Sequence, residues 1–255
     1  MLPALYHEHH SHHMEDLPLW VNLARRYGSP ILELGCGTGR ILINLAREDY
    51  VVYGLDSNLD MLSFLIGNLP GDLHDHAHVF QADMASFRLA KRFPLIILPC
   101  NTLSTLSREE RSSTFSRVRE HLLLGGVFVA SIPNPNILLN LPEEGESDLE
   151  EIFHHRTSGN PVQVSSSWRR LRGVLTIKWS YDLLFPDGRV QRVVAMISHQ
   201  LDPVSVYKRE LKAQGMECVN EYGDYDLSKF RPDSTYWICV AGLMPLTEGR
   251  GDSKS

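Results

Sequence analysis

The fold is decided by the stretch Pro30-Ile31-Leu32-Glu33-Leu34-Gly35-Cys36-Gly37-Thr38-Gly39-Arg40. Its first half is an apolar run with one acid, which predicts a strand buried on both faces of a parallel sheet. Its second half has glycine at three alternate positions, where a backbone can turn sharply and approach a ligand closely. A helical pattern follows at once, over Ile41–Glu48. The stretch therefore predicts a strand, a tight turn and a helix.

Three interpretations of this turn are open. A dinucleotide site has the spacing Gly-x-Gly-x-x-Gly, in which backbone amides and a helix N-terminus bind a pyrophosphate. Here the third glycine, Gly39, comes one residue early, and Arg40 stands where that pattern has glycine. Glu33 would repel a pyrophosphate and attract a cationic group. These features favour an adenosyl ligand with an amino-acid tail over a dinucleotide; a turn with no ligand is the third interpretation.

A second buried strand, Tyr50–Asp56, ends in an acid. Asp56 lies 21 residues beyond Gly35, about where a carboxylate can accept the ribose hydroxyls of a nucleoside on the first turn. The alternative is an N-cap of the helix predicted over Leu59–Leu69, a role that Ser57 or Asn58 could also fill. With the glycine turn beside it, the ribose role is favoured.

The whole chain predicts an α/β fold with a doubly wound, mostly parallel seven-stranded sheet. Further strands are expected at 79–84, 93–98 and 127–132, with helices at 17–27, 108–121 and 206–214. Segments 218–222 and 235–241 form a terminal antiparallel hairpin. Residues 133–160 are expected to be a solvated loop because they carry prolines and an acid run.

Residues 162–201 predict an inserted antiparallel sheet. Val174–Tyr181 alternates, Asp187-Gly188 is a tight-turn pair, and Arg189–Ser198 supplies a returning strand. The sheet is expected to cover the ligand pocket at the glycine turn or to form a homodimer surface. One domain then spans 1–247, with a core of 17–132 and 203–242 and an insert at about 160–202, before a disordered tail at 248–255.

Composition excludes several classes of protein. The 255 residues are 43% hydrophobic and 22% charged with a net charge of −6, which offers no support for binding nucleic acid or an anionic membrane. The four cysteines form no Cys-x-x-Cys pair, so we expect reduced thiols in a soluble, cytoplasmic protein.

Five histidines stand near the N-terminus: His7, His9, His10, His12 and His13. Imidazole is the commonest metal ligand, but this spacing matches no zinc pattern. We therefore expect a mobile or lid-like segment and no metal. A helix should follow, capped by Asp16 with proline in its first turn and stopped by Gly28.

The stretch from Glu33 to Gly39 closely resembles the first motif of class I S-adenosylmethionine (SAM)-dependent methyltransferases, an acid followed by x-Gly-x-Gly-x-Gly. Over Leu32–Ile132 the chain is similar to the small-molecule N-methyltransferase branch, which includes glycine N-methyltransferase and the dTDP-aminosugar N,N-dimethyltransferases. The resemblance implies a Rossmann-like methyltransferase fold, SAM as cofactor, S-adenosylhomocysteine (SAH) as product, and a small-molecule acceptor.

The resemblance also implies residue roles. Asp83 would accept the adenine amine, Met84 would contact the ring, and Tyr6 and Arg40 would reach the methionyl end. For Arg40 a solvent-facing position is the alternative. The residues expected to bind the methyl donor, SAM, are Glu33, Gly35, Cys36, Gly37, Arg40, Asp56, Ser57, Met61, Asp83, Met84, Pro99 and Asn101.

The exit of the fourth strand, Pro99–Leu103, lacks both the Asn-Pro-Pro-Tyr pattern and the aspartate of metal-dependent relatives. We therefore expect metal-free, in-line methyl transfer to a small molecule, at nitrogen in preference to oxygen. The alternative is a catalytically silent protein that binds SAM or SAH as a partner or sensor. Candidate substrate contacts are Tyr6, Asn101, His199, Tyr181 and Glu221, and none is assigned as a catalytic base.

Overall fold

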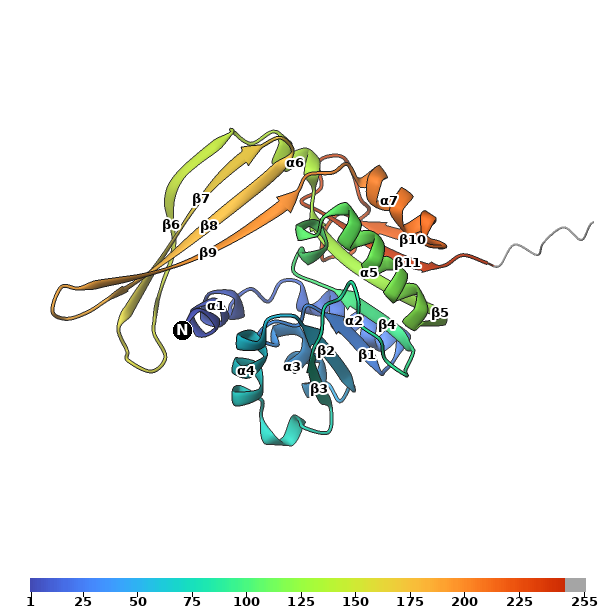
Figure 1. Cartoon of the computed structure of the whole chain (residues 1–255), viewed down its shortest axis with the longest axis horizontal. Helices are drawn as coiled ribbons and strands as arrows, with labels where there is room; N and C mark the ends of the chain where they lie inside the picture. The colour runs from blue at the N-terminus through green and yellow to red at the C-terminus, as the bar shows by residue number, and fades with distance from the viewer. Residues whose placement is uncertain (246–255) are drawn as a thin grey trace, which may run out of the picture.

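A computed structural model describes residues 1–245 and contains two β-sheets (Figure 1). The larger sheet has seven strands in the order β10-β11-β5-β4-β1-β2-β3. Strands β1 to β5 are parallel, β11 is antiparallel to β5, and β10 is antiparallel to β11. Their bounds are β1 Ile31–Leu34, β2 Val52–Asp56, β3 Ala77–Gln81, β4 Phe93–Leu98, β5 Leu122–Pro133, β10 Met216–Tyr222 and β11 Tyr236–Leu243. The predicted fold class is confirmed.

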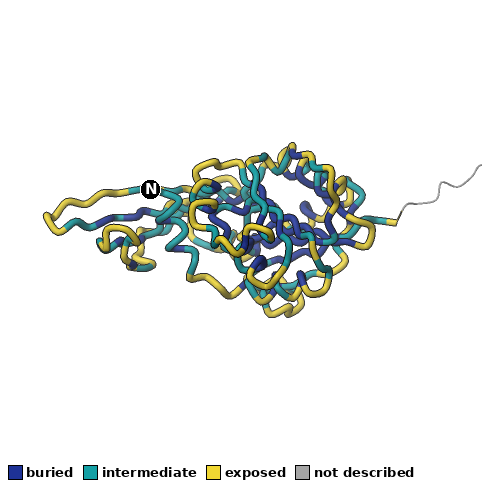
Figure 2. Tube along the Cα trace, turned by 90° about the horizontal axis from the view of Figure 1, so that it is seen from below, coloured by how far each residue is buried: buried dark blue, intermediate teal, exposed yellow. Residues whose placement is uncertain are grey.

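Helices cover both faces of this sheet, as the predicted winding requires. One face packs against α2 (Leu17–Tyr27), α3 (Arg40–Arg47) and α4 (Leu59–Asn68). The opposite face packs against α5 (Arg108–His121) and α7 (Val204–Ala213). Short 3-10 turns occur at Gly71–Leu73 (η1) and Thr102–Thr105 (η2). Figure 2 shows the buried residues concentrated in this layered part, while much of the inserted arm is intermediate or exposed.

Strand β1 is buried on both faces, as its apolar run predicted. Ile31 packs toward α2 and α3, whereas Leu32 and Leu34 belong to the cluster under α5 and α7. Successive side chains of a strand point to opposite faces, so Glu33 lies on the α2 and α3 face together with Ile31. That alternation places a carboxylate inside the protein, next to the turn where a ligand is expected.

The predicted acid, Asp16, is the N-cap residue of α2, and Gly28, with a φ of +79°, is its C-cap residue. The expected cap is wrong in one respect, because the Asp16 side chain makes no capping hydrogen bond. Its carboxylate instead accepts a hydrogen bond from Trp20 Nε1 at 2.9 Å and pairs with Arg40. Because the Asp16 carboxylate binds Trp20 and Arg40, it does not cap the helix.

The smaller sheet is the inserted arm at the upper left of Figure 1, with all its strands antiparallel. Its strands are β6 Glu144–His154, β7 Pro161–Leu171, β8 Val174–Leu184 and β9 Val190–Gln200. The predicted turn joins β8 to β9, with Gly188 at a φ of +83°. Helix α1 (Leu2–Ser11) packs on this sheet through the fully buried Leu5. The N-terminal segment is thus a docked helix.

The solvated loop expected at 133–160 is wrong. This segment contains helix α6 (Pro135–Leu139) and the whole of β6. β6 is an edge strand whose residues are mostly exposed, a position where charged side chains are common in natural sheets. Backbone pairing with β7 forms the strand whatever the side chains are, and Glu150 and Glu151 face His9 of α1 and His12 just after it. The acid run therefore led to the prediction of a loop where the chain forms a strand.

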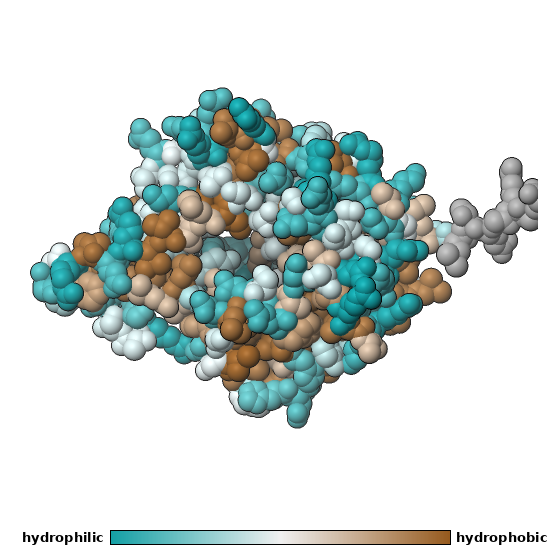
Figure 3. All heavy atoms as spheres, viewed as in Figure 1, coloured by the Kyte–Doolittle hydropathy of each residue, from teal (hydrophilic) through white to brown (hydrophobic). Residues whose placement is uncertain are grey.

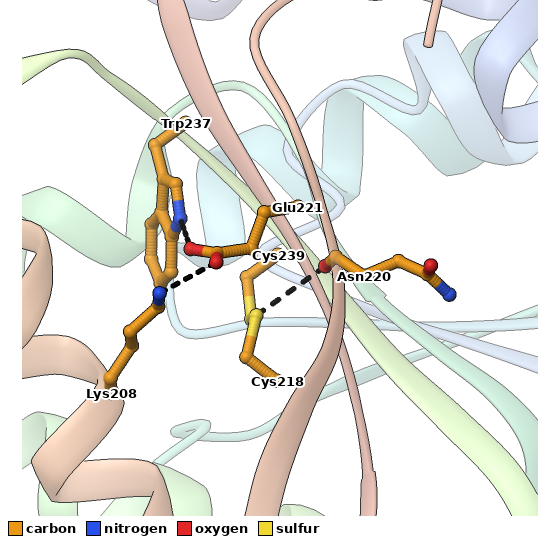
Figure 4. Close-up of a disulfide and its surroundings, with 6 residues drawn as sticks. All are labelled: Lys208, Cys218, Asn220, Glu221, Trp237 and Cys239. Atoms are coloured by element: carbon orange, nitrogen blue, oxygen red, sulfur yellow. Dashed lines mark hydrogen bonds and ion pairs between the residues drawn. A yellow bond between two sulfur atoms is a disulfide. The ribbon is translucent and has the colours of Figure 1, made fainter. Parts of the chain in front are cut away.

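The expectation of four reduced thiols is also wrong. Cys218 and Cys239 form a disulfide between β10 and β11 (Figure 4), while Cys36 and Cys100 are free. The two cysteines are 21 residues apart in sequence, and the antiparallel register with its bulge at Cys218–Asn220 brings their Cα atoms to 6.0 Å. Sequence spacing alone does not show such a register.

Within residues 1–245, no helix is both long enough and apolar enough to cross a membrane. The tail predicted to be disordered, 248–255, lies outside the described residues.

Leu32→Ala tests the core under β1. Leu32 is fully buried, so the substitution should lower the free energy of unfolding by about 2–5 kcal/mol through lost burial and a residual cavity. Urea denaturation measures the change. Leu124→Ala is the matched control, because Leu124 is 91% exposed and should change stability by less than about 0.5 kcal/mol. Equal losses for both variants would contradict this packing.

Candidate functional site

A cavity of about 730 Å³ lies beyond the carboxyl ends of β1 and β4. Its walls come from α1, the glycine turn, the exit of β4, α6, the inserted sheet and the segment between β10 and β11. Figure 3 shows the molecule hollowed between the inserted arm and the rest of the chain. Ligands of doubly wound sheets bind at this edge, so the cavity is the candidate site.

The glycine turn forms one wall of the cavity with its backbone. Gly35, Gly37 and Gly39 all have positive φ, at +68°, +53° and +88°. A Cβ at Gly37 would meet no atom within 4 Å, whereas one at Gly39 would lie 2.3 Å from Leu65 Cδ1. Gly37 therefore keeps the turn open toward a ligand, and Gly39 lets α4 pack closely.

Asp56 fixes the turn from the neighbouring strand. Its Oδ2 accepts a hydrogen bond from the Gly37 amide at 2.8 Å, and its Oδ1 accepts one from the Asn58 amide at 2.8 Å. Asn58, not Asp56, is the N-cap of α4, since its side chain accepts from Asp60 and Met61 amides. Of the two roles weighed for Asp56, capping is therefore excluded.

Glu33 supplies a buried and incompletely paired carboxylate. It is 2% exposed, and its Oε2 has no hydrogen-bond partner in the described part of the chain. Burial raises the pKa of Glu33 well above its usual value, and the nearby Arg40 opposes that shift. A cationic ligand group next to Oε2 would stabilise the ionised form.

The Arg40 guanidinium is held inside the protein. Its two terminal nitrogens donate to both oxygens of Asp16, to the His13 carbonyl at 2.6 Å and to Cys100 Sγ at 3.0 Å. Four donor hydrogens are therefore occupied, and the expected solvent-facing alternative does not apply. Only Nε of Arg40 has a hydrogen left to donate to the carboxylate of a ligand.

The exit of β4 has an unusual backbone. Cys100 and Asn101 both have left-handed φ values, +58° and +60°, a conformation that costs a non-glycine residue on the order of 1–3 kcal/mol. Asn101 Oδ1 is buried without a hydrogen-bond partner among residues 1–245 and lines the cavity. The strained turn thus presents a hydrogen-bond acceptor to a ligand.

The tautomer of His199 follows from its partner. Ser104 Oγ donates to the Asn101 carbonyl at 2.8 Å and lies 2.8 Å from His199 Nδ1. A hydroxyl has a single hydrogen, so Ser104 accepts a hydrogen bond from Nδ1–H and the lone pair is left on Nε2. Burial lowers the pKa of His199 to about 4. At neutral pH the cavity therefore contains a neutral imidazole that can accept a hydrogen bond.

The structure brings together eight of the predicted site residues. The cavity is lined by Tyr6, Glu33, Gly35, Cys36, Gly37, Arg40, Asn101 and His199. The other residues expected to bind SAM lie outside the cavity lining: Asp56, Ser57, Met61, Asp83, Met84 and Pro99. Met84 Cε is nevertheless 3.3 Å from the position of a Cβ at Gly35, next to the turn. Asp83 is exposed and accepts a hydrogen bond from the Ala85 amide at 2.8 Å.

Two candidate substrate contacts have other roles. The Tyr181 hydroxyl is 3.1 Å from His9 Nδ1, and its ring belongs to the core of the inserted arm. Glu221 accepts hydrogen bonds from Trp237 Nε1 at 2.7 Å and Lys208 Nζ at 2.6 Å, as Figure 4 shows. Neither residue lines the cavity.

Sequence reasoning missed much of the cavity lining. Unpredicted lining residues include His10, Ile137, Leu175, Ile177, Trp179, Ile197, Asp224, Tyr225 and Tyr236. The alternation over Val174–Tyr181 did contain a signal, since Leu175, Ile177 and Trp179 share one face of β8. Nothing local indicated α6 or the segment before β11.

The described donor side fits a sulfonium nucleoside with an amino-acid tail. Residues 31–126 match a family model described as a methyltransferase domain. A solved SAM-dependent methyltransferase from Clostridium acetobutylicum ATCC 824 has the same fold, with a TM-score of 0.76, 15% identity and coverage of 90% of this chain and 93% of that one. Residues 31–126 form a methyltransferase domain, and the chain is similar to SAM-dependent methyltransferases. The predicted family, enzyme class and cofactor are confirmed.

Two relatives are similar to this methyltransferase in sequence. A protein of Geobacillus sp. (strain WCH70), provisionally named a methyltransferase, is 29% identical over 207 residues, or 79% of each chain. The Streptomyces venezuelae dTDP-3-amino-3,4,6-trideoxy-alpha-D-glucopyranose N,N-dimethyltransferase is 32% identical over 102 residues, or 40% of this chain and 41% of that protein.

Asp16→Asn tests the support of the methyltransferase site. The variant keeps the size of the side chain but leaves the largely buried Arg40 side chain without a carboxylate. The free energy of unfolding should therefore fall by about 3 kcal/mol. Urea denaturation gives the value. Asp187→Asn breaks an exposed pair with Arg189 and should leave stability within experimental error. A similarly small effect of Asp16→Asn would show that the Asp16–Arg40 pair is dispensable.

Proposed function

We propose that this enzyme transfers the methyl group of SAM to the nitrogen of a small-molecule amine by in-line displacement without a metal. The observation that carries the proposal is the polarity of the cavity. It contains the carboxylates of Glu15, Asp16, Glu33 and Asp224, and Arg40 is the one lysine or arginine among its described lining residues. Because Arg40 is paired with Asp16, the remaining field favours a cationic sulfonium and an amine.

On the donor side, Glu33 Oε2 would bind the ammonium of the methionyl tail. The backbone at Gly35–Gly37 would lie along the tail and ribose, since no side chain fills the space at Gly37. Each oxygen of Asp56 accepts one backbone hydrogen bond and has a second lone pair for a ribose hydroxyl. Asp83 and Met84 would contact the adenine from the next strand.

On the acceptor side, Asn101 Oδ1 and His199 Nε2 would orient the amine. Both are hydrogen-bond acceptors, which suits the N–H groups of a neutral amine and leaves its lone pair directed at the methyl carbon. The sulfonium is already activated, so positioning of nitrogen, carbon and sulfur in line supplies most of the catalysis. Leu175, Ile177, Trp179 and Ile197 line the arm side of the cavity and would contact an apolar part of the acceptor.

Glu33→Gln tests the ammonium contact. The variant should bind SAH more weakly by about 1.5–3 kcal/mol, the range for a hydrogen bond to a charged group. Without ligand the pKa of Glu33 is raised, whereas an ammonium favours its ionised form. Wild-type affinity should therefore fall as pH falls through that raised pKa, and the slope should be absent in Glu33→Gln. Calorimetry at several pH values measures both effects; identical pH profiles would refute the contact.

The acceptor class is tested with matched pairs of amines and alcohols that share one apolar skeleton. SAH release should occur with amines and should rise with pH toward the pKa of the amine, because only its neutral form is nucleophilic. Gly37→Val protein is the control for background, since the new side chain fills the donor space. Turnover of the alcohols alone would overturn the proposal. SAH binding without turnover of any acceptor would favour the silent partner or sensor.

A further inference from the structure

The N-terminal histidines form a cluster that methyl transfer does not use. One ring nitrogen from each of His9, His10 and His13 lies within 4.8 Å of the other two. His9 and His10 lie in the last turn of α1, and His13 follows two residues after the end of that helix. His10 completes a set of three imidazoles, the number that a zinc ion takes in many protein sites.

We propose that His9, His10 and His13 bind one divalent transition-metal ion of the zinc class, which ties α1 to the inserted sheet. Imidazole nitrogens suit zinc, copper and nickel ions. Tetrahedral binding at about 2.0–2.1 Å requires nitrogens about 3.4 Å apart, so the rings must close by little more than an ångström. His13 lies beyond the end of α1 and is exposed, which leaves it room to move.

His10 shows an unsatisfied atom at this place. Its Nε2 is buried and has no hydrogen-bond partner in the described residues. The ring is stacked 4.4 Å from that of His9 and lies 4.1 Å from that of Tyr6, centre to centre. A buried ring nitrogen without a partner costs free energy, and a metal ion would satisfy it.

His9 has the surroundings of a metal ligand. The ring is 3% exposed; its Nε2 lies 3.3 Å from Glu150 Oε2 and its Nδ1 lies 3.1 Å from the Tyr181 hydroxyl. Whichever nitrogen binds the ion, the other keeps a polar partner, as ligating histidines commonly do.

The ion would have a structural role. Glu150 comes from β6, and His12 also pairs with Glu151 of that strand at 3.0 Å. Fixing His10 and His13 would hold the cavity side of α1, since both residues line the cavity. The ion would thus shape the wall of the acceptor chamber without entering the displacement.

The test uses full-length protein without a histidine tag, freed of metal with a chelator and titrated with zinc chloride in the absence of SAM. One ion per chain should bind and raise the melting temperature. Cobalt(II) should give the visible absorption of a four-coordinate site. Less than one ion per chain, or a cobalt spectrum like that of the ion in water, would overturn the proposal.

Three variants locate the ion. Glu150→Gln should weaken zinc binding by about 10–100-fold, as expected for a residue that orients a ligand, and His10→Ala and His13→Gln should weaken it further. His74→Ala is the matched control, because His74 is exposed and lies outside the cluster. His13→Gln changes an exposed residue, so its folding is secure. Zinc affinity unchanged in both His10→Ala and His13→Gln would refute the site independently of any methyl transfer.

Discussion

The buried pairing of Arg40 with Asp16 is the constraint on which the donor side of this methyltransferase depends. Asp16 directly precedes α2, Arg40 begins α3, and the same guanidinium binds the His13 carbonyl and Cys100 at the exit of β4. A buried guanidinium left without its carboxylate is strongly destabilising, so these segments must meet at one point. Since Asp16 satisfies Arg40, Glu33 is left with an oxygen for a cationic ligand.

Helix α1 physically connects the two halves of the cavity. His7 Nδ1 lies 3.0 Å from Thr38 Oγ1 in the glycine turn, while His9 contacts Tyr181 in the inserted sheet. The inserted sheet and the glycine turn therefore both contact one short helix. A change in the position of α1 would alter both sites at once, which is why a metal ion on this helix would bear on acceptor binding.

What the sequence could predict was local. The buried strand, the glycine turn, Asp56 and the hairpin at Asp187-Gly188 each follow from a few adjacent residues. Strand β6 could not be predicted, because its acids resemble a solvated loop until an edge position and a partner helix are known. The disulfide depends on a strand register, and the loss of the Asp16 cap depends on Arg40, 24 residues away. The contact of His9 with Glu150 likewise joins residues that are 141 apart in the numbering.

The charge of the cavity does not suit the dTDP-linked sugar that the name of the Streptomyces venezuelae relative gives for that protein. A dTDP-linked sugar carries a diphosphate, and proteins bind phosphate with arginine, lysine or backbone amides. Here the cavity offers Arg40, which Asp16 already neutralises, against further carboxylates and an apolar wall of β8 and β9. This polarity of the lining supports the proposed acceptor, an amine with an apolar body.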